Sequence, residues 1–82
     1  MEQCYICKQY NYCETHHIFN GSNRKKSEEY GSLIRVCRKC HTEIHRNYEL
    51  RSELKKQAQE KIMQAENWTI EDFRQVFYKN YL

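Results

Sequence analysis

The sequence predicts a small α+β fold in which two short strands and a helix form a core and further helices follow. Residues 15–19 are rich in β-branched and aromatic side chains, and residues 32–36 form a second run of the same kind. From Arg38 onward the apolar spacing becomes helical. Two Cys-x2-Cys pairs flank these segments, which indicates that a bound metal ion holds the ends of the core together.

The size of the chain makes such a metal ion important. The chain has 82 residues, of which 39% are hydrophobic and 30% are charged. A domain of this length buries only about 60% of the surface that its unfolded chain exposes, so its apolar core is thin. A structural metal ion is a common remedy in small domains.

Four of the five cysteines belong to the two pairs: Cys4, Cys7, Cys37 and Cys40. Because no stretch approaches the ~18 apolar residues of a membrane span, we expect a cytoplasmic protein that has no membrane partner. In a reducing compartment such pairs bind metal rather than form disulfides, and an odd number of cysteines fits a disulfide framework poorly. We therefore predict a structural zinc ion on the four thiolates. Cys13 is expected to be a half-buried residue rather than a ligand.

The four histidines form a second pattern. His41 and His45 lie four residues apart in the predicted helix, so both can reach one metal ion. His16 and His17 are adjacent in a predicted strand and point to opposite faces, so one can complete the ligand set while the other acts on a substrate as a base. Three imidazoles leave coordination positions open, which is typical of a catalytic ion. The alternative is a second closed zinc site formed by Cys13, His16, His41 and His45.

Beyond residue 46 the chain is expected to be helical. Residues 20–31 predict a polar loop within the core, and we divide the single domain into a core of residues 1–46 and a helical extension of residues 47–82 that packs on it. The first helix of the extension has one apolar stripe, which consists of Leu50, Leu54, Ala58, Ile62 and Ala65.

A second helix of the extension is predicted to begin at Thr69. This threonine is a good N-cap, and Asp72 occupies the third helical position of a capping box. Trp68 is placed to pack on Phe73 as a hydrophobic staple. Phe73 is also expected to belong to the buried face of this helix.

The combined cysteine and histidine pattern resembles the HNH endonucleases. Cys-x2-Cys, then His-His-Ile at the end of a strand, then Cys-x2-Cys-His at the start of a helix is similar to their ββα-metal fold, a treble-clef-like finger stapled by zinc. The stretch from Cys4 to His45 carries this resemblance. The residues that follow His16 are similar to small HNH proteins encoded by phages and prophages of Gram-positive bacteria. The pair His41-x3-His45 resembles the arrangement in nuclease colicins.

The resemblance implies a role for each matched position. It implies that His16, His41 and His45 bind the catalytic ion and that His17 is the general base. The family has an asparagine nine residues before the final motif histidine, where it braces a loop and helps to orient the base. Ser32 stands at that position here, and a single hydroxyl can replace only part of that bracing.

The family implies hydrolysis of DNA, by nicking or by double-strand cleavage, with a structural Zn²⁺ and one catalytic divalent ion (Mg²⁺, Mn²⁺, Zn²⁺, Ni²⁺ or Co²⁺). The net charge of +3 and a basic rim around the core fit such a partner. The predicted phosphate contacts are Arg24, Lys25, Lys26 and Arg35. A bacterial or phage-encoded cytoplasmic protein is expected, and phage packaging proteins are a further candidate partner. The alternative function is a non-catalytic module that holds two zinc ions and binds DNA or a protein.

Overall fold

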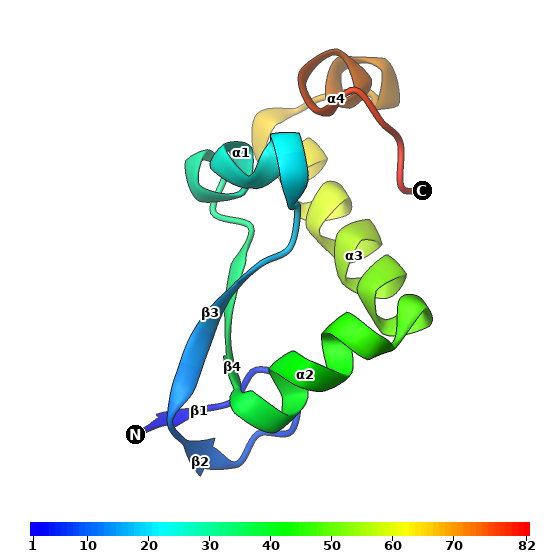
Figure 1. Ribbon diagram of the computed structural model, residues 1–82. Helices are drawn as coiled ribbons and strands as arrows, with labels where there is room; N and C mark the ends of the chain where they lie inside the picture. Colours follow the sequence, from blue (N-terminus) through cyan, green and yellow to red (C-terminus); the bar gives the residue numbers. More distant parts are fainter.

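The centre of the fold is an antiparallel hairpin. In the computed structural model, which describes residues 1–82, strand β3 (Cys13–His17) pairs with strand β4 (Leu33–Cys37), and His16 lies opposite Ile34. A second, smaller hairpin of β1 (Glu2–Gln3) and β2 (Tyr10–Asn11) lies at the N-terminus. The hairpins and the helices together confirm the predicted α+β class (Figure 1).

Both central strands are shifted from the predicted positions. β3 ends at His17, although the strand was predicted to run to Phe19, and β4 begins one residue later than predicted. Phe19 leaves the ladder because the hydroxyl of Ser27 bonds its backbone: Ser27 Oγ donates to the Phe19 carbonyl at 2.6 Å and accepts from its N–H at 2.9 Å. The aromatic character of this run therefore reflects burial in the core rather than strand pairing.

The predicted loop of residues 20–31 is wrong, because most of it is helical. A 3-10 turn, η1 (Gly21–Asn23), leads into helix α1 (Arg24–Glu29), and Gly31 then reverses the chain at a φ of +71°. Glycine adopts such a positive φ without steric cost. Two contacts hold the helix: Ser27 bonds Phe19, and the Asn23 amide donates to the Phe77 carbonyl at 2.9 Å. Both partners lie outside the segment, so its polar composition did not indicate a helix.

Three helices follow β4, as predicted. They are α2 (Arg38–Arg46), α3 (Tyr48–Glu66) and α4 (Ile70–Phe77). The predicted capping box is present, since Asp72 N–H donates to Thr69 Oγ1 at 3.2 Å and Thr69 N–H donates to Asp72 Oδ2 at 2.9 Å. Leu54, Ala58 and Ile62 of the α3 stripe are buried. None of the helices combines the length and apolarity that a bilayer crossing needs.

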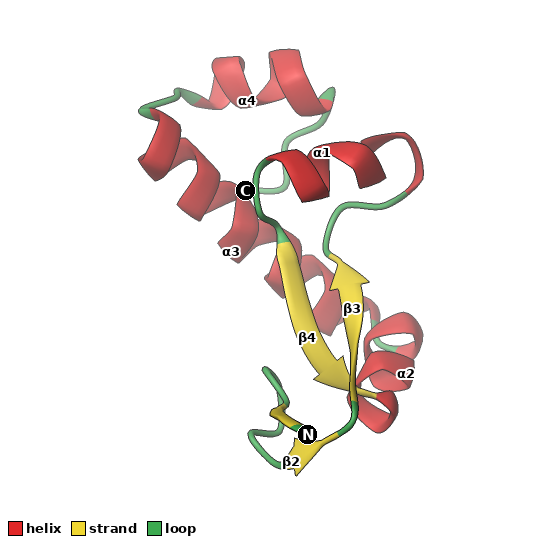
Figure 2. Cartoon of the chain, turned by 90° about the vertical axis from the view of Figure 1, so that its left-hand side faces the viewer, coloured by secondary structure: helices red, strands yellow, loops and turns green.

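The helices enclose the hairpin from one side. α3 runs beside it, α2 closes one end, and α1 and α4 lie at the other end (Figures 1 and 2). At that end Phe19 packs against Phe77 with ring centroids 4.8 Å apart, and Phe73 stacks on Phe77 at 4.4 Å. The ring of Trp68 packs edge-on to Tyr30 at 5.4 Å. The extension therefore supplies much of the aromatic core.

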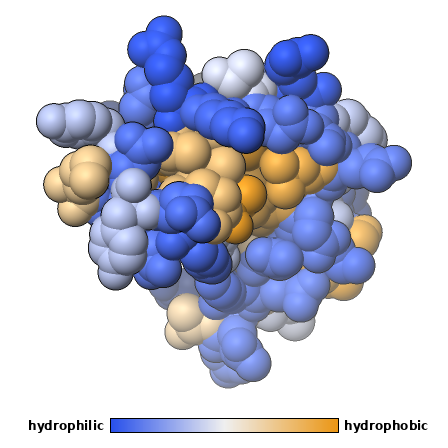
Figure 3. All heavy atoms as spheres, turned by 90° about the horizontal axis from the view of Figure 1, so that it is seen from below, coloured by the Kyte–Doolittle hydropathy of each residue, from blue (hydrophilic) through white to orange (hydrophobic).

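A groove of about 710 Å³ lies between β4 and α3. Ile18, Ile34 and Leu54 contribute to its apolar lining, and Lys8 and Lys61 are among its polar residues. Seen from below, the molecule has apolar side chains gathered in a hollow among hydrophilic ones (Figure 3).

Candidate metal centres

The four predicted cysteine ligands come together in one cluster. β4 ends at Cys37, α2 carries Cys40, and the turn after β1 carries the other pair, so the ligand atoms of Cys4, Cys7, Cys37 and Cys40 all lie within 4.8 Å of one another. Cys7 Sγ and Cys37 Sγ are 3.9 Å apart. Four sulfurs at 2.3 Å from a tetrahedral zinc ion are separated by about 3.8 Å. The cluster therefore fits a structural zinc ion.

The electrostatics of the cluster also favour a cation. Burial alone would raise the pKa of Cys4, but backbone N–H groups, including that of Cys37 at 3.4 Å, lower it to about 6. Burial and the neighbouring sulfurs raise the pKa of Cys40 to about 12. The Cys4 thiolate is thus stabilised, while the Cys40 thiol resists ionisation. A bound divalent ion is what allows several adjacent thiols to lose their protons.

The three predicted imidazole ligands form a second cluster. His16 comes from β3, and His41 and His45 come from successive turns of α2, with ligand nitrogens within 4.8 Å of one another. The ring centroids are 5.2 Å apart for His16 and His41, and 4.9 Å apart for His41 and His45. α2 therefore contributes ligand atoms to both clusters, because Cys40 and His41 are adjacent in it.

His16 is the most buried member of this cluster. It is 5% exposed. Burial, followed by the charges of His41 and His45, lowers the pKa of His16 to about 4. A neutral imidazole keeps a lone pair for a metal ion, so this histidine is ready to bind one near pH 7.

A carboxylate that sequence reasoning missed orients one of these ligands. Glu14 Oε1 lies 3.0 Å from Nδ1 of His41, and this hydrogen bond lowers the pKa of Glu14. A carboxylate accepts the proton of Nδ1, which leaves the Nε2 lone pair of the ring for a metal ion. Glu14 shares its strand face with His16, because side chains alternate along β3. This alternation is the signal that could have indicated Glu14.

His17 points away from the imidazole cluster and meets a second carboxylate. Its Nε2 lies 3.0 Å from Glu28 Oε1, where α1 crosses the end of the hairpin. This hydrogen bond lowers the pKa of Glu28. Only 14% of the His17 side chain is exposed, so the contact fixes a largely buried ring. Sequence reasoning missed Glu28 because the residues around it were expected to form a loop.

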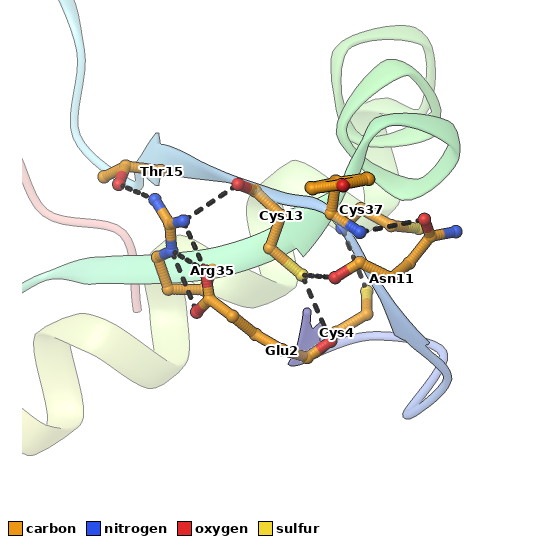
Figure 4. A network of polar contacts seen from close by, with 8 residues as sticks. Glu2, Cys4, Asn11, Cys13, Thr15, Arg35 and Cys37 are labelled. Carbon is orange, nitrogen blue, oxygen red and sulfur yellow. Dashed lines mark hydrogen bonds and ion pairs between the residues drawn. The ribbon is translucent and has the colours of Figure 1, made fainter.

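Cys13 does not belong to the imidazole cluster. It lies on the opposite face of β3 from His16, with its sulfur 3.7 Å from the carbonyl oxygens of Glu2 and Asn11 (Figure 4). It is half-buried. The closed zinc site considered for Cys13 and the three histidines is therefore not formed, because strand alternation directs the thiol away from them.

Ser32, which stands where the resemblance places an asparagine, is held in position by its backbone. Ser32 is 5% exposed; its N–H donates to the Ser27 carbonyl at 2.7 Å, and its carbonyl accepts from Ile18 N–H at 3.1 Å. The side-chain bonds that brace this region come from Ser27, whose hydroxyl joins α1 to Phe19. This region is therefore braced by Ser27 of α1, a residue that the sequence did not single out.

Two of the four side chains predicted to contact phosphate have hydrogen-bond partners within the protein. Arg35 bonds the carboxylate of Glu2, the hydroxyl of Thr15 and the carbonyl of Cys13 (Figure 4). Lys26 donates to the Val76 carbonyl near the end of α4. Both side chains were predicted to contact a phosphate backbone, which stays a prediction; in the structure they bind groups of the protein itself.

The other two predicted contacts are exposed. Arg24 and Lys25 lie on α1, and their charges act on Glu28. They are therefore near the His17–Glu28 pair and free to meet an anion.

Comparisons of the chain with protein-family models, curated proteins and solved structures found no match. The two clusters and their surroundings therefore have to support a functional assignment by themselves.

Proposed function

We propose that the protein is a metal-dependent DNA endonuclease of the HNH type, with a ββα-metal core in residues 1–46. The observation that supports this proposal is the pairing of two different clusters around α2. Four sulfurs form a site that a zinc ion would close, and three imidazoles form a site that would keep positions open for water and phosphate. A purely structural module has no need of the second, open site.

The proposed reaction is hydrolysis of a phosphodiester bond. When bound at the imidazole cluster, a divalent ion (Mg²⁺, Mn²⁺, Zn²⁺, Ni²⁺ or Co²⁺) supplies positive charge that stabilises the scissile phosphate and the leaving oxygen. His16, His41 and His45 would hold that ion, and Glu14 would orient His41. The structural zinc ion would hold β4 and α2 in the arrangement that brings these ligands together.

His17 is the proposed general base. Its Nε2–H donates to Glu28, so the lone pair that accepts a proton from water is on Nδ1. The Glu28 carboxylate holds this tautomer and stabilises the imidazolium that forms when the proton arrives, as the acid does in other acid–histidine pairs. Arg24 and Lys25, which act on Glu28, would attract the phosphate backbone to this side of the hairpin.

A plasmid-nicking assay tests the proposal. We expect cleavage that depends on a divalent ion and stops with chelator. Removal of a general base costs about 10²–10⁴-fold, so His17→Ala and His17→Gln should each lose activity by this factor while they keep the metal content and circular dichroism of the parent.

Cleavage by His17→Ala at the parent rate would refute the assignment of the base. Two tightly bound zinc ions per chain, with no cleavage by any divalent ion, would refute the nuclease and support the non-catalytic module instead.

A further inference from the structure

Two lysines outside the recognised motif lie over one tyrosine ring. Lys55 comes from the middle of α3 and Lys79 from the segment after α4, and their Nζ atoms lie 5.5 and 5.6 Å from the ring centroid of Tyr81. We refer to Lys55, Lys79 and Tyr81 as the C-terminal cation site. The two lysines are 24 positions apart in the sequence (79 minus 55), so only the tertiary fold brings them to the same ring.

The segment that carries Lys79 and Tyr81 is held firmly against α3. Gln59 is fully buried. Its Oε1 accepts from the Tyr81 N–H at 2.7 Å, and its Nε2 donates to Asn80 Oδ1 at 2.8 Å. The tyrosine ring also packs 5.2 Å from that of Phe19. The positions of the two lysines are therefore set by packed neighbours rather than by a free tail.

The two ammonium groups have no acidic partner. None of the four ion pairs of the protein includes Lys55 or Lys79. Partial burial, followed by the charges of Lys79 and Arg51, lowers the pKa of Lys55. The charge of Lys79 therefore disfavours the charged form of Lys55. An anion bound between them would remove this repulsion.

The α3 part of the site adjoins the helix that carries two of the imidazoles. Arg51, one helical turn before Lys55, donates to the carbonyls of Ile44 and His45 at 3.2 and 2.6 Å, so this face of α3 adjoins the end of α2. The charge of Lys55 also acts on His16. A nucleic-acid strand whose phosphate reached the imidazole cluster would therefore pass these lysines.

We propose that Lys55 and Lys79 together bind a backbone phosphate next to the one held at the imidazole cluster. This inference rests on the proposed function, because it names DNA as the anion. It adds a contact in the C-terminal extension, for which the sequence favoured packing on the core over a partner-binding role. Lysine serves this purpose as a point charge that needs no fixed geometry. The alternative is that the two stems only cover the tyrosine ring, since lysines commonly pack this way.

Fluorescence anisotropy on a labelled DNA duplex tests the proposal. The full zinc-loaded chain is compared with Lys55→Gln/Lys79→Gln across a series of salt concentrations. The matched control is Lys56→Gln/Lys61→Gln, which removes the same charge from exposed positions of α3. Each lysine that contacts a phosphate adds about one unit to the slope of log Kobs against log salt. We expect the first variant to lose about 1–2 units and the control to keep the parent slope.

The arginine variant Lys55→Arg/Lys79→Arg separates charge from packing. It should keep the parent slope if the positive charges bind phosphate. Equal slopes for the two glutamine variants, or no DNA binding by the parent chain, would overturn the inference. The nicking assay is scored separately: if cleavage is absent while the slope still falls, the nuclease fails and the phosphate site stands. If cleavage occurs while the slopes are equal, the phosphate site fails and the nuclease stands.

Discussion

The hydrogen bond between Glu14 and His41 makes a sharp prediction about metal binding. Glu14→Gln keeps the size of the side chain but removes its charge, so the Nδ1 proton of His41 loses a carboxylate acceptor 3.0 Å away. Loss of such an outer partner commonly weakens metal binding 10–100-fold. Because 49% of the Glu14 side chain and 23% of the His41 side chain are exposed, solvent screens the interaction. We therefore expect about a tenfold loss of affinity, at the lower end of that range.

Calorimetric titration measures this affinity. The chain is first loaded with one equivalent of zinc, which the thiolate cluster should take, and is then titrated with Co²⁺. Glu60→Gln is the matched control, since it removes an exposed carboxylate of α3 that makes none of the structure's ion pairs. The reasoning is refuted if Glu14→Gln binds Co²⁺ as tightly as the parent, or if the control loses as much affinity.

Two further predictions concern stability. Ser27→Ala removes both hydrogen bonds to the Phe19 backbone and leaves buried polar groups without partners, which should lower the free energy of unfolding by about 2–3 kcal/mol. Urea unfolding of the zinc-loaded chain measures this, and a loss below about 1 kcal/mol would contradict it. The second prediction concerns His16, whose pKa of about 4 lies below the unfolded value near 6.5. Between these values the unfolded chain binds more protons, so stability should fall as the pH falls. With the imidazole cluster free of metal, the parent should lose about 2 kcal/mol more than His16→Gln between pH 7.5 and 5, and equal losses would contradict this.

The sequence by itself determined the features that depend on near neighbours. The spacing of each cysteine pair, the interval between His41 and His45 and the apolar stripe of α3 concern residues within one or two turns. The Thr69 capping box is also local, and the structure places it as predicted. The same local rules indicated that His16 and His17 face opposite ways. The cysteine cluster and the pair of His41 and His45 were therefore predictable from their intervals, whereas the choice of His16 over His17 as the third imidazole came from the family resemblance.

Only the tertiary structure decided which groups surround those residues. Alternation along β3 places Glu14 on the face of His16, but its contact with His41, 27 positions away, is decided by the fold, as is the contact of Glu28 with His17, 11 positions away. Residues 24–29 are polar and by themselves favour a loop. The hydrogen bonds between Ser27 and Phe19 instead support the helix, and Phe19 lies outside this segment.

The partners of the basic residues also depend on the tertiary structure. Arg35 and Lys26 have the charge that a phosphate contact needs, but packing brings each one to partners inside the protein. Lys55 and Lys79 belong to no motif, yet the fold places them over the same ring without an acid. Charge is a property of the sequence, whereas the neutralisation of a charge depends on which groups folding brings within hydrogen-bond distance of it.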